Sequence, residues 1–195
     1  MKKLLAIGVP ILIASIFPIS AMATESSEWK HHSTPITSPV EVDLEGTYSF
    51  SGGFSCPEVT AKATLNPGST GTINSFVLTN TSKCTVIGGL AALGCTALTA
   101  HTPTELPWVI HNTKTDVTIT NTVMHNTIKG GGLCASGISL TLTGNLTATP
   151  FKTNGTPSAN TIETFKLDGT LKSSTGTNVT IDGDLTITPE GTYSL

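Results

Sequence analysis

The most specific chemistry in this sequence belongs to its four cysteines, which are Cys56, Cys84, Cys95 and Cys134. An even number of cysteines in a chain that begins with a secretion signal, described below, predicts two disulfides rather than catalytic thiols. Four cysteines allow three connectivities, and sequence alone does not choose among them. We favour Cys56–Cys84, because a hairpin between residues 58 and 79 would bring those two together, and Cys95–Cys134 then follows by elimination.

Histidines are the second group of residues that could carry chemistry, as metal ligands. His101, His111 and His125 lie on separate segments, and no HxH or HExxH spacing joins any two of them. His31 and His32 are adjacent but have no third ligand beside them. We therefore interpret all five as ordinary solvated residues of strand surfaces or of the N-terminal arm, and predict no metal site.

The sequence also lacks the common signatures of catalysis. Asp182-Gly183-Asp184 does not have the further oxygen ligands of a calcium loop, so we interpret it as part of a solvated strand face. The run Gly130-Gly131-Gly132 is not followed by the Lys-Ser/Thr pair of a phosphate-binding loop, and no G-x-S-x-G motif occurs. The sequence predicts a protein that is not an enzyme and has no cofactor.

The elements that must position these residues begin after an N-terminal targeting segment. Residues 1–23 have the three parts of a secretory signal peptide: the basic residues Lys2 and Lys3, an apolar run over 4–17, and the small-residue cleavage site Ala21-Met22-Ala23. The next residue is Thr24, where a bacterial lipoprotein would have cysteine. We expect a secreted or cell-surface protein, extracellular or periplasmic, with no membrane span after cleavage.

Composition excludes several classes of partner. Removal of Lys2 and Lys3 takes the formal net charge from −3 to −5, and the sequence contains no arginine. Sequence-specific nucleic-acid binding and attachment to anionic membranes both need basic residues, so neither is expected. Threonine supplies about one residue in five, which favours strands, and the roughly 170 residues after the signal suggest one domain.

Alternation of apolar and polar residues, typical of strands with one buried face, recurs from residue 40 onward. It is clearest in the segments 138–147, 165–172 and 179–188, where every second residue is apolar or glycine. We predict a single all-β domain over residues 40–195, an antiparallel β-sandwich or barrel-like sandwich with two disulfides. Residues 24–39 are polar and contain two prolines, and are predicted to form a flexible N-terminal arm.

Two segments inside the domain allow more than one interpretation. Trp108, in Leu106-Pro107-Trp108, could be a platform for a carbohydrate or an apolar ligand, but we prefer a structural role in the core. Leu90-Ala91-Ala92-Leu93 could form one helical turn. The glycines on both sides of it favour a loop instead.

The order of these features resembles a known group of secreted proteins. Cys56, a Thr/Gly-rich hairpin, Cys84, Leu106-Pro107-Trp108 and Leu133-Cys134 follow one another as in the β-rich proteins grouped with the Pra-type activators of alkane oxidation. The resemblance covers residues 53–149, and Cys95 and the meander after Pro150 depart from it. It implies a non-enzymatic protein that acts in adhesion, in biofilm or on hydrophobic substrates. Its partners would be a second copy of itself or components of the surface and biofilm matrix.

Three other functions remain as alternatives. A fimbrial subunit would be secreted, disulfide-bonded and rich in threonine, and could donate its N-terminal arm as a strand to a neighbour. An ice-binding protein would use Thr-x-Thr pairs, which occur at 118/120, 141/143 and 186/188 without a fixed repeat. A secreted hydrolase is the third, although no catalytic triad is visible.

Overall fold

The computed structural model describes residues 27–151, 161–188 and 193–195. The signal peptide predicted for residues 1–23 lies outside the described residues. The helical turns are η1 (Thr81–Lys83), α1 (Gly88–Ala92) and η2 (Gly132–Cys134). The strands, in chain order, are β1 (Lys30–His31), β2 (Thr34–Pro35), β3 (Val40–Phe50), β4 (Phe54–Leu65), β5 (Thr70–Leu78), β6 (Thr85–Val86), β7 (Cys95–Thr104), β8 (Trp108–Asn112), β9 (Val117–Gly130), β10 (Ile138–Phe151), β11 (Thr164–Ser173), β12 (Asn178–Thr188) and β13 (Tyr193–Ser194).

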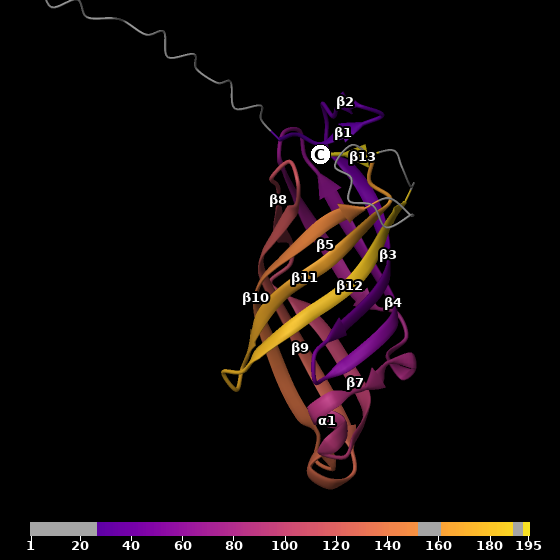
Figure 1. Cartoon of the computed structure of the whole chain (residues 1–195), viewed down its shortest axis with the longest axis vertical. Coiled ribbons are helices and arrows are strands. Elements are labelled where there is room, and N and C mark those ends of the chain that lie inside the picture. Colours follow the sequence, from indigo (N-terminus) through magenta and orange to yellow (C-terminus); the bar gives the residue numbers. More distant parts are fainter. Residues whose placement is uncertain (1–26, 152–160, 189–192) are drawn as a thin grey trace, which may run out of the picture.

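Eight antiparallel strands close into a barrel, which confirms the predicted all-β antiparallel class in its barrel form. Hydrogen-bonded neighbours follow the order β10, β11, β12, β3, β4, β5, β8 and β9, and β9 pairs again with β10. β7 continues from β8 along the same edge of β9. Figure 1 shows the barrel with α1 and the β9–β10 connection at one end, and β1, β2 and β13 at the other. Closure leaves each barrel strand with a partner on both sides.

The period-two pattern of the sequence decides which face of each strand points inward. In β12 the apolar residues Val179, Ile181, Leu185 and Ile187 are buried, and the polar residues between them are exposed or partly exposed. Gly183 takes the remaining inward position, where a Cβ atom would lie 2.4 Å from the carbonyl oxygen of Thr47. Glycine is therefore required there by the close approach of β3, a common reason for glycine in the middle of a strand.

Both predicted disulfides are confirmed. Cys56, in β4, is bonded to Cys84, which directly follows η1, and Cys95 at the start of β7 is bonded to Cys134 at the end of η2. No cysteine of the chain is free. Cross-links that close loops of this length stabilise a folded chain by roughly 3–4 kcal/mol on the chain-entropy estimate.

Residues 27–39 correct the prediction of a flexible arm over 24–39. They fold across the end of the barrel away from α1, as a short hairpin of β1 and β2 in which β1 also pairs with β13. Trp29, only 1% exposed, joins the core there, and its indole Nε1 donates a hydrogen bond to the carbonyl oxygen of Thr70, 2.9 Å away. Burial of this large apolar side chain offsets the polar character of its neighbours. Residues 24–26 lie outside the described part of the chain.

Candidate functional site

Trp108, which the sequence analysis assigned to the core, is 2% exposed. Its indole Nε1 donates a hydrogen bond to the carbonyl oxygen of Thr104 at 2.9 Å, and its ring centroid lies 5.9 Å from that of Phe76. With its ring buried and its only donor already bonded, Trp108 has no face to offer to a ligand from solution. The candidate site lies elsewhere.

The histidines are not brought together. His125 is exposed and its Nδ1 lies 2.8 Å from the Thr141 hydroxyl, and His111 is also exposed. His101 departs from the expected surface position, because it packs beside Tyr48 and Phe76 and its Nε2 is buried. Within the ranges that the structure describes, no group of three or more His, Cys, Asp or Glu side chains could hold a metal ion.

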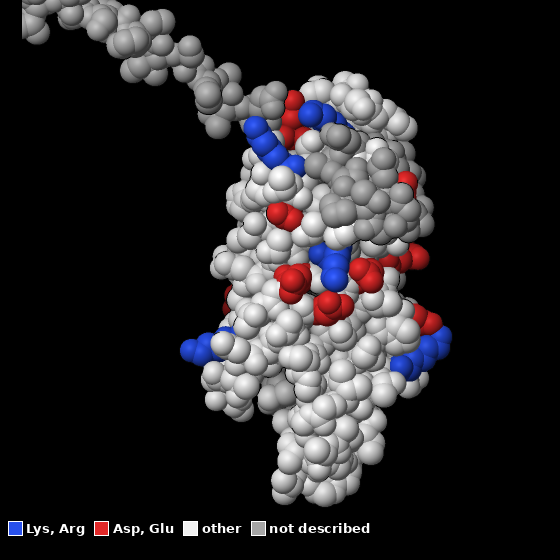
Figure 2. Space-filling view, viewed as in Figure 1, with Lys and Arg blue, Asp and Glu red and all other residues white. Residues whose placement is uncertain are grey.

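Asp182 and Asp184 lie on the exposed outer face of β12, as interpreted from the sequence. Their neighbours across the ladder to β11 are Asp168 and Lys166, respectively. Figure 2 shows that the charged residues visible on this face of the molecule gather around its middle and its end near β13. This pattern is that of a solvated strand face.

The end of the barrel near α1 differs from the rest of the surface because its own two segments contain no charged residue; the exposed Lys129 lies directly beside them, against Gly137. No charged residue occurs between Lys83 and Glu105, or from Gly130 to Phe151. The lower end of the molecule is accordingly without red or blue atoms in Figure 2. We call α1 with residues 93–94, together with residues 130–137, the apolar tip. These two segments are far apart in sequence and form the candidate functional site.

Two leucines protrude from the apolar tip. Leu93, directly after α1, is 41% exposed, and Leu133, within η2, is 72% exposed. Ala91, Ala92 and Ala135 are exposed beside them in the sequence. Large apolar side chains exposed together on a charge-free surface are typical of a binding site for an apolar partner.

Backbone contacts hold the two halves of the apolar tip together. The amide of Leu133 donates to the carbonyl of Leu93 at 3.2 Å, and the amide of Gly131 donates to the carbonyl of Gly94 at 2.9 Å. A Cβ atom on Gly94, where φ is +87°, would lie 2.9 Å from the Gly131 carbonyl oxygen, so only glycine allows this approach. The Cys95–Cys134 disulfide follows directly after these contacts.

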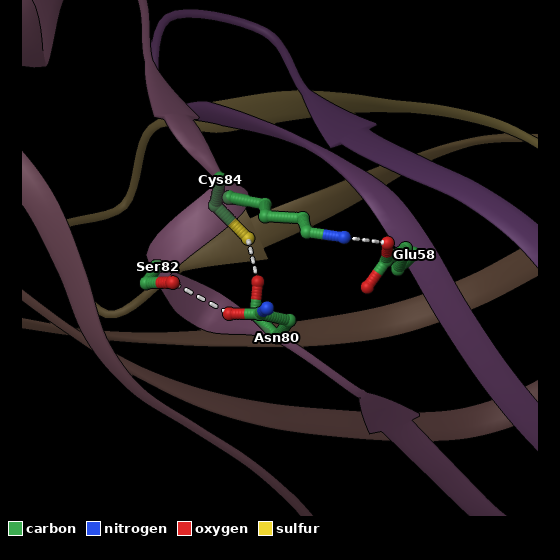
Figure 3. Close-up of polar contacts among 5 residues, drawn as sticks. Glu58, Asn80, Ser82 and Cys84 are labelled. Atoms are coloured by element: carbon green, nitrogen blue, oxygen red, sulfur yellow. Dashed lines mark hydrogen bonds and ion pairs between the residues drawn. The ribbon is translucent and has the colours of Figure 1, made fainter.

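A second set of contacts fixes the segment that leads into α1 (Figure 3). Lys83 forms an ion pair with Glu58 of β4, and the Ser82 hydroxyl donates to the Asn80 side-chain oxygen at 2.6 Å. The sulfur of Cys84 lies 4.0 Å from the Asn80 carbonyl oxygen, a contact without a hydrogen because that sulfur is in a disulfide. The amide of Leu90 then donates to the carbonyl of Gly52 at 3.0 Å. The apolar tip therefore has a fixed shape.

Sequence reasoning did not identify Leu93 and Leu133 as a site. It favoured a loop where the structure has the single helical turn α1, and it interpreted residues 130–132 only as a turn. The available signal was a pair of glycine-flanked leucines in segments that contain no charge and show no alternation. The predicted Cys95–Cys134 disulfide already implied that the two leucines are close, but their exposure together was not predicted and depends on how β7 pairs with β9.

Comparison of the chain with protein-family models, curated proteins and solved structures found no match. Within the described residues, no helix has the length and apolar character needed to cross a membrane.

Proposed function

We propose that this protein is a secreted or surface-attached, non-enzymatic protein that binds hydrophobic surfaces through its apolar tip. The observation that carries the proposal is that Leu93 and Leu133 protrude together from a rigid, uncharged end of the barrel. The partner is an uncharged apolar interface, such as an oil droplet. A charged partner is disfavoured, because the two segments of the apolar tip contain no charged residue and Lys129, beside Gly137, is a single cation.

The energetics of the apolar tip fit this partner. Burial of a leucine side chain is worth about 1.5–3 kcal/mol when it is complete. The disulfide and the backbone contacts already hold the two leucines in place, so little conformational entropy is lost on binding. Two leucines with adjacent alanines would hold the protein at an oil–water interface reversibly.

The extracellular part of the proposal has separate support. Two disulfides are stable in an oxidising compartment and are rare in the cytosol. The predicted signal peptide and the resemblance to the Pra-type group favour the same location and the same kind of partner.

Adsorption to hexadecane droplets tests the proposal. The Leu93→Asn, Leu133→Asn double variant should adsorb at least about tenfold more weakly than the wild type, because loss of ~1.4 kcal/mol corresponds to tenfold. The matched control is Val77→Asn, which changes a side chain that is 49% exposed on the wall of the barrel rather than at the apolar tip. Circular dichroism and melting temperature establish that each variant is folded.

Four outcomes would contradict the proposal. The double variant could adsorb as well as the wild type, or the control could lose adsorption equally. Sedimentation could show that the wild type is a dimer and that the double variant is a monomer. The partner of the apolar tip would then be a second copy of the chain. Hydrolase turnover by the purified protein, together with unchanged adsorption, would overturn the non-enzymatic assignment.

A further inference from the structure

A second feature lies at the opposite end of the barrel, beneath Trp29. A cavity of about 40 Å³ is lined there by side chains from all eight barrel strands. Every one of these side chains is apolar, among them Leu44, Leu65, Ile119 and Phe165. The indole of Trp29 completes the lining, and its N–H is already bonded to the carbonyl of Thr70. The cavity therefore offers no hydrogen-bonding group to an occupant.

The cover over this cavity is a small element, attached through Trp29, through Ile36 and through the pairing of β1 with β13. We call residues 29–36 the cap, because they contain Trp29 and the β1–β2 hairpin. The Trp29 amide donates to the Gly68 carbonyl at 3.0 Å, and the Ile36 amide donates to the Trp29 carbonyl at 3.0 Å. Strands β1 and β2 have only two residues each. The indole is thus the main apolar contact of the cap with the barrel, with a smaller one from the buried Ile36.

The turn of the cap is strained. His32 and Ser33, which join β1 to β2, have φ values of +48° and +65°. Two-residue hairpin turns with positive φ at both positions normally contain Asn-Gly, because other side chains are crowded in this conformation. This backbone strain lies within the β1–β2 hairpin, so opening relieves it only by unfolding that hairpin, and a strained segment over a cavity is a reason to look for function.

We propose that the apolar interior beneath Trp29 is a binding site for a small, uncharged hydrocarbon, and that the cap moves aside to admit it. A cavity lined only by apolar side chains stays dry, and it selects molecules that have no polar group to desolvate. The space that is free while the cap is closed admits only an occupant about the size of one or two water molecules. A larger hydrocarbon enters by taking the place of the indole. This site is separate from the apolar tip and does not depend on its function.

Benzene and n-hexane are the probes, and nuclear magnetic resonance is the readout. Protein with ¹⁵N-labelled tryptophan gives one indole N–H signal for Trp29 and one for Trp108, which a Trp29→Phe variant assigns. Either probe should shift the Trp29 signal as its bond to Thr70 is broken, and should leave the Trp108 signal in place. The tip variant Leu133→Asn should bind the probes as the wild type does.

Relaxing the turn provides the sharper test. The His32→Asn, Ser33→Gly double variant has the residues that such a turn prefers, so the closed cap should be favoured and both probes should bind about tenfold more weakly. Trp29→Ala should bind them more tightly than the wild type. Two results would overturn the proposal. One is that the probes bind Trp29→Ala but leave the wild-type Trp29 signal unchanged. The indole would then be a fixed part of the core that no probe displaces. The other is that the relaxed turn leaves affinity unchanged.

Discussion

His101 Nδ1 lies 2.7 Å from Asn126 Oδ1, across the pairing of β7 with β9. The imidazole therefore donates to the amide oxygen, and its Nε2 is left as a buried acceptor without a hydrogen-bond partner in the described chain. Tyr48, whose hydroxyl donates to the sulfur of Met124, and Phe76 pack around the ring. Burial lowers the pKa of His101, and the hydrogen bond to Asn126 opposes this in part.

Stability should consequently fall as the solution becomes acidic. The unfolded chain binds a proton at His101 near pH 6.5, whereas the folded protein resists it down to its lowered pKa. The melting temperature should therefore be highest above pH 6.5 and drop between pH 6.5 and the lowered pKa. His101→Gln should flatten this part of the profile, and His125→Gln, at an exposed histidine, should not. Parallel profiles for the wild type and His101→Gln would show that His101 is not responsible.

Removal of the second disulfide should loosen the apolar tip more than the barrel. Cys95→Ser with Cys134→Ser should lower the free energy of unfolding by up to about 4 kcal/mol, since the bond spans 39 residues. Amide exchange at residues 91–94 and 131–134 should accelerate ahead of exchange in β12.

Thiol titration of the denatured, unreduced wild type should detect no thiol. Detection of two or more would disprove the pairing.

Trp108 should behave as a structural residue. Trp108→Ala should destabilise the fold by ~3–5 kcal/mol, because it removes a fully buried ring that contacts Phe76 and leaves a cavity. Chemical denaturation measures the change. Trp108→Phe should recover a large part of the loss. The opposite result would be a Trp108→Ala protein that keeps normal stability but no longer binds a sugar or oil. Trp108 would then be a ligand-binding residue.

Gly46 should tolerate no side chain. A Cβ atom there would lie 1.7 Å from the carbonyl oxygen of Asp184 on the neighbouring strand, so Gly46→Ala must push β3 away from β12. We expect destabilisation at or above the upper end of the roughly 1–3 kcal/mol that overpacking causes. Gly131→Ala is the control, because nothing lies within 4 Å of its added methyl group. Equal melting temperatures for the two variants would contradict the close packing of these strands.

Local pattern alone determined much of the barrel wall. The alternation in 179–188 assigned the inward and outward faces of β12, because successive side chains of a strand point to opposite sides. The hairpin of β4 and β5 indicated the Cys56–Cys84 pair, since its two ends must meet. Both inferences use residues that are close in sequence or that follow a fixed period.

Tertiary structure decided what the candidate sites present. The predicted Cys95–Cys134 bond implied that Leu93 and Leu133 are close, but their joint exposure depends on the pairing of β7 with β9. Trp29 caps the barrel only because eight strands close around a shared apolar interior. A polar, proline-containing segment gives no local sign that one tryptophan in it will be buried by residues far along the chain. Such contacts depend on how the strands register and close, and the free energy that selects that arrangement is spread over the whole core.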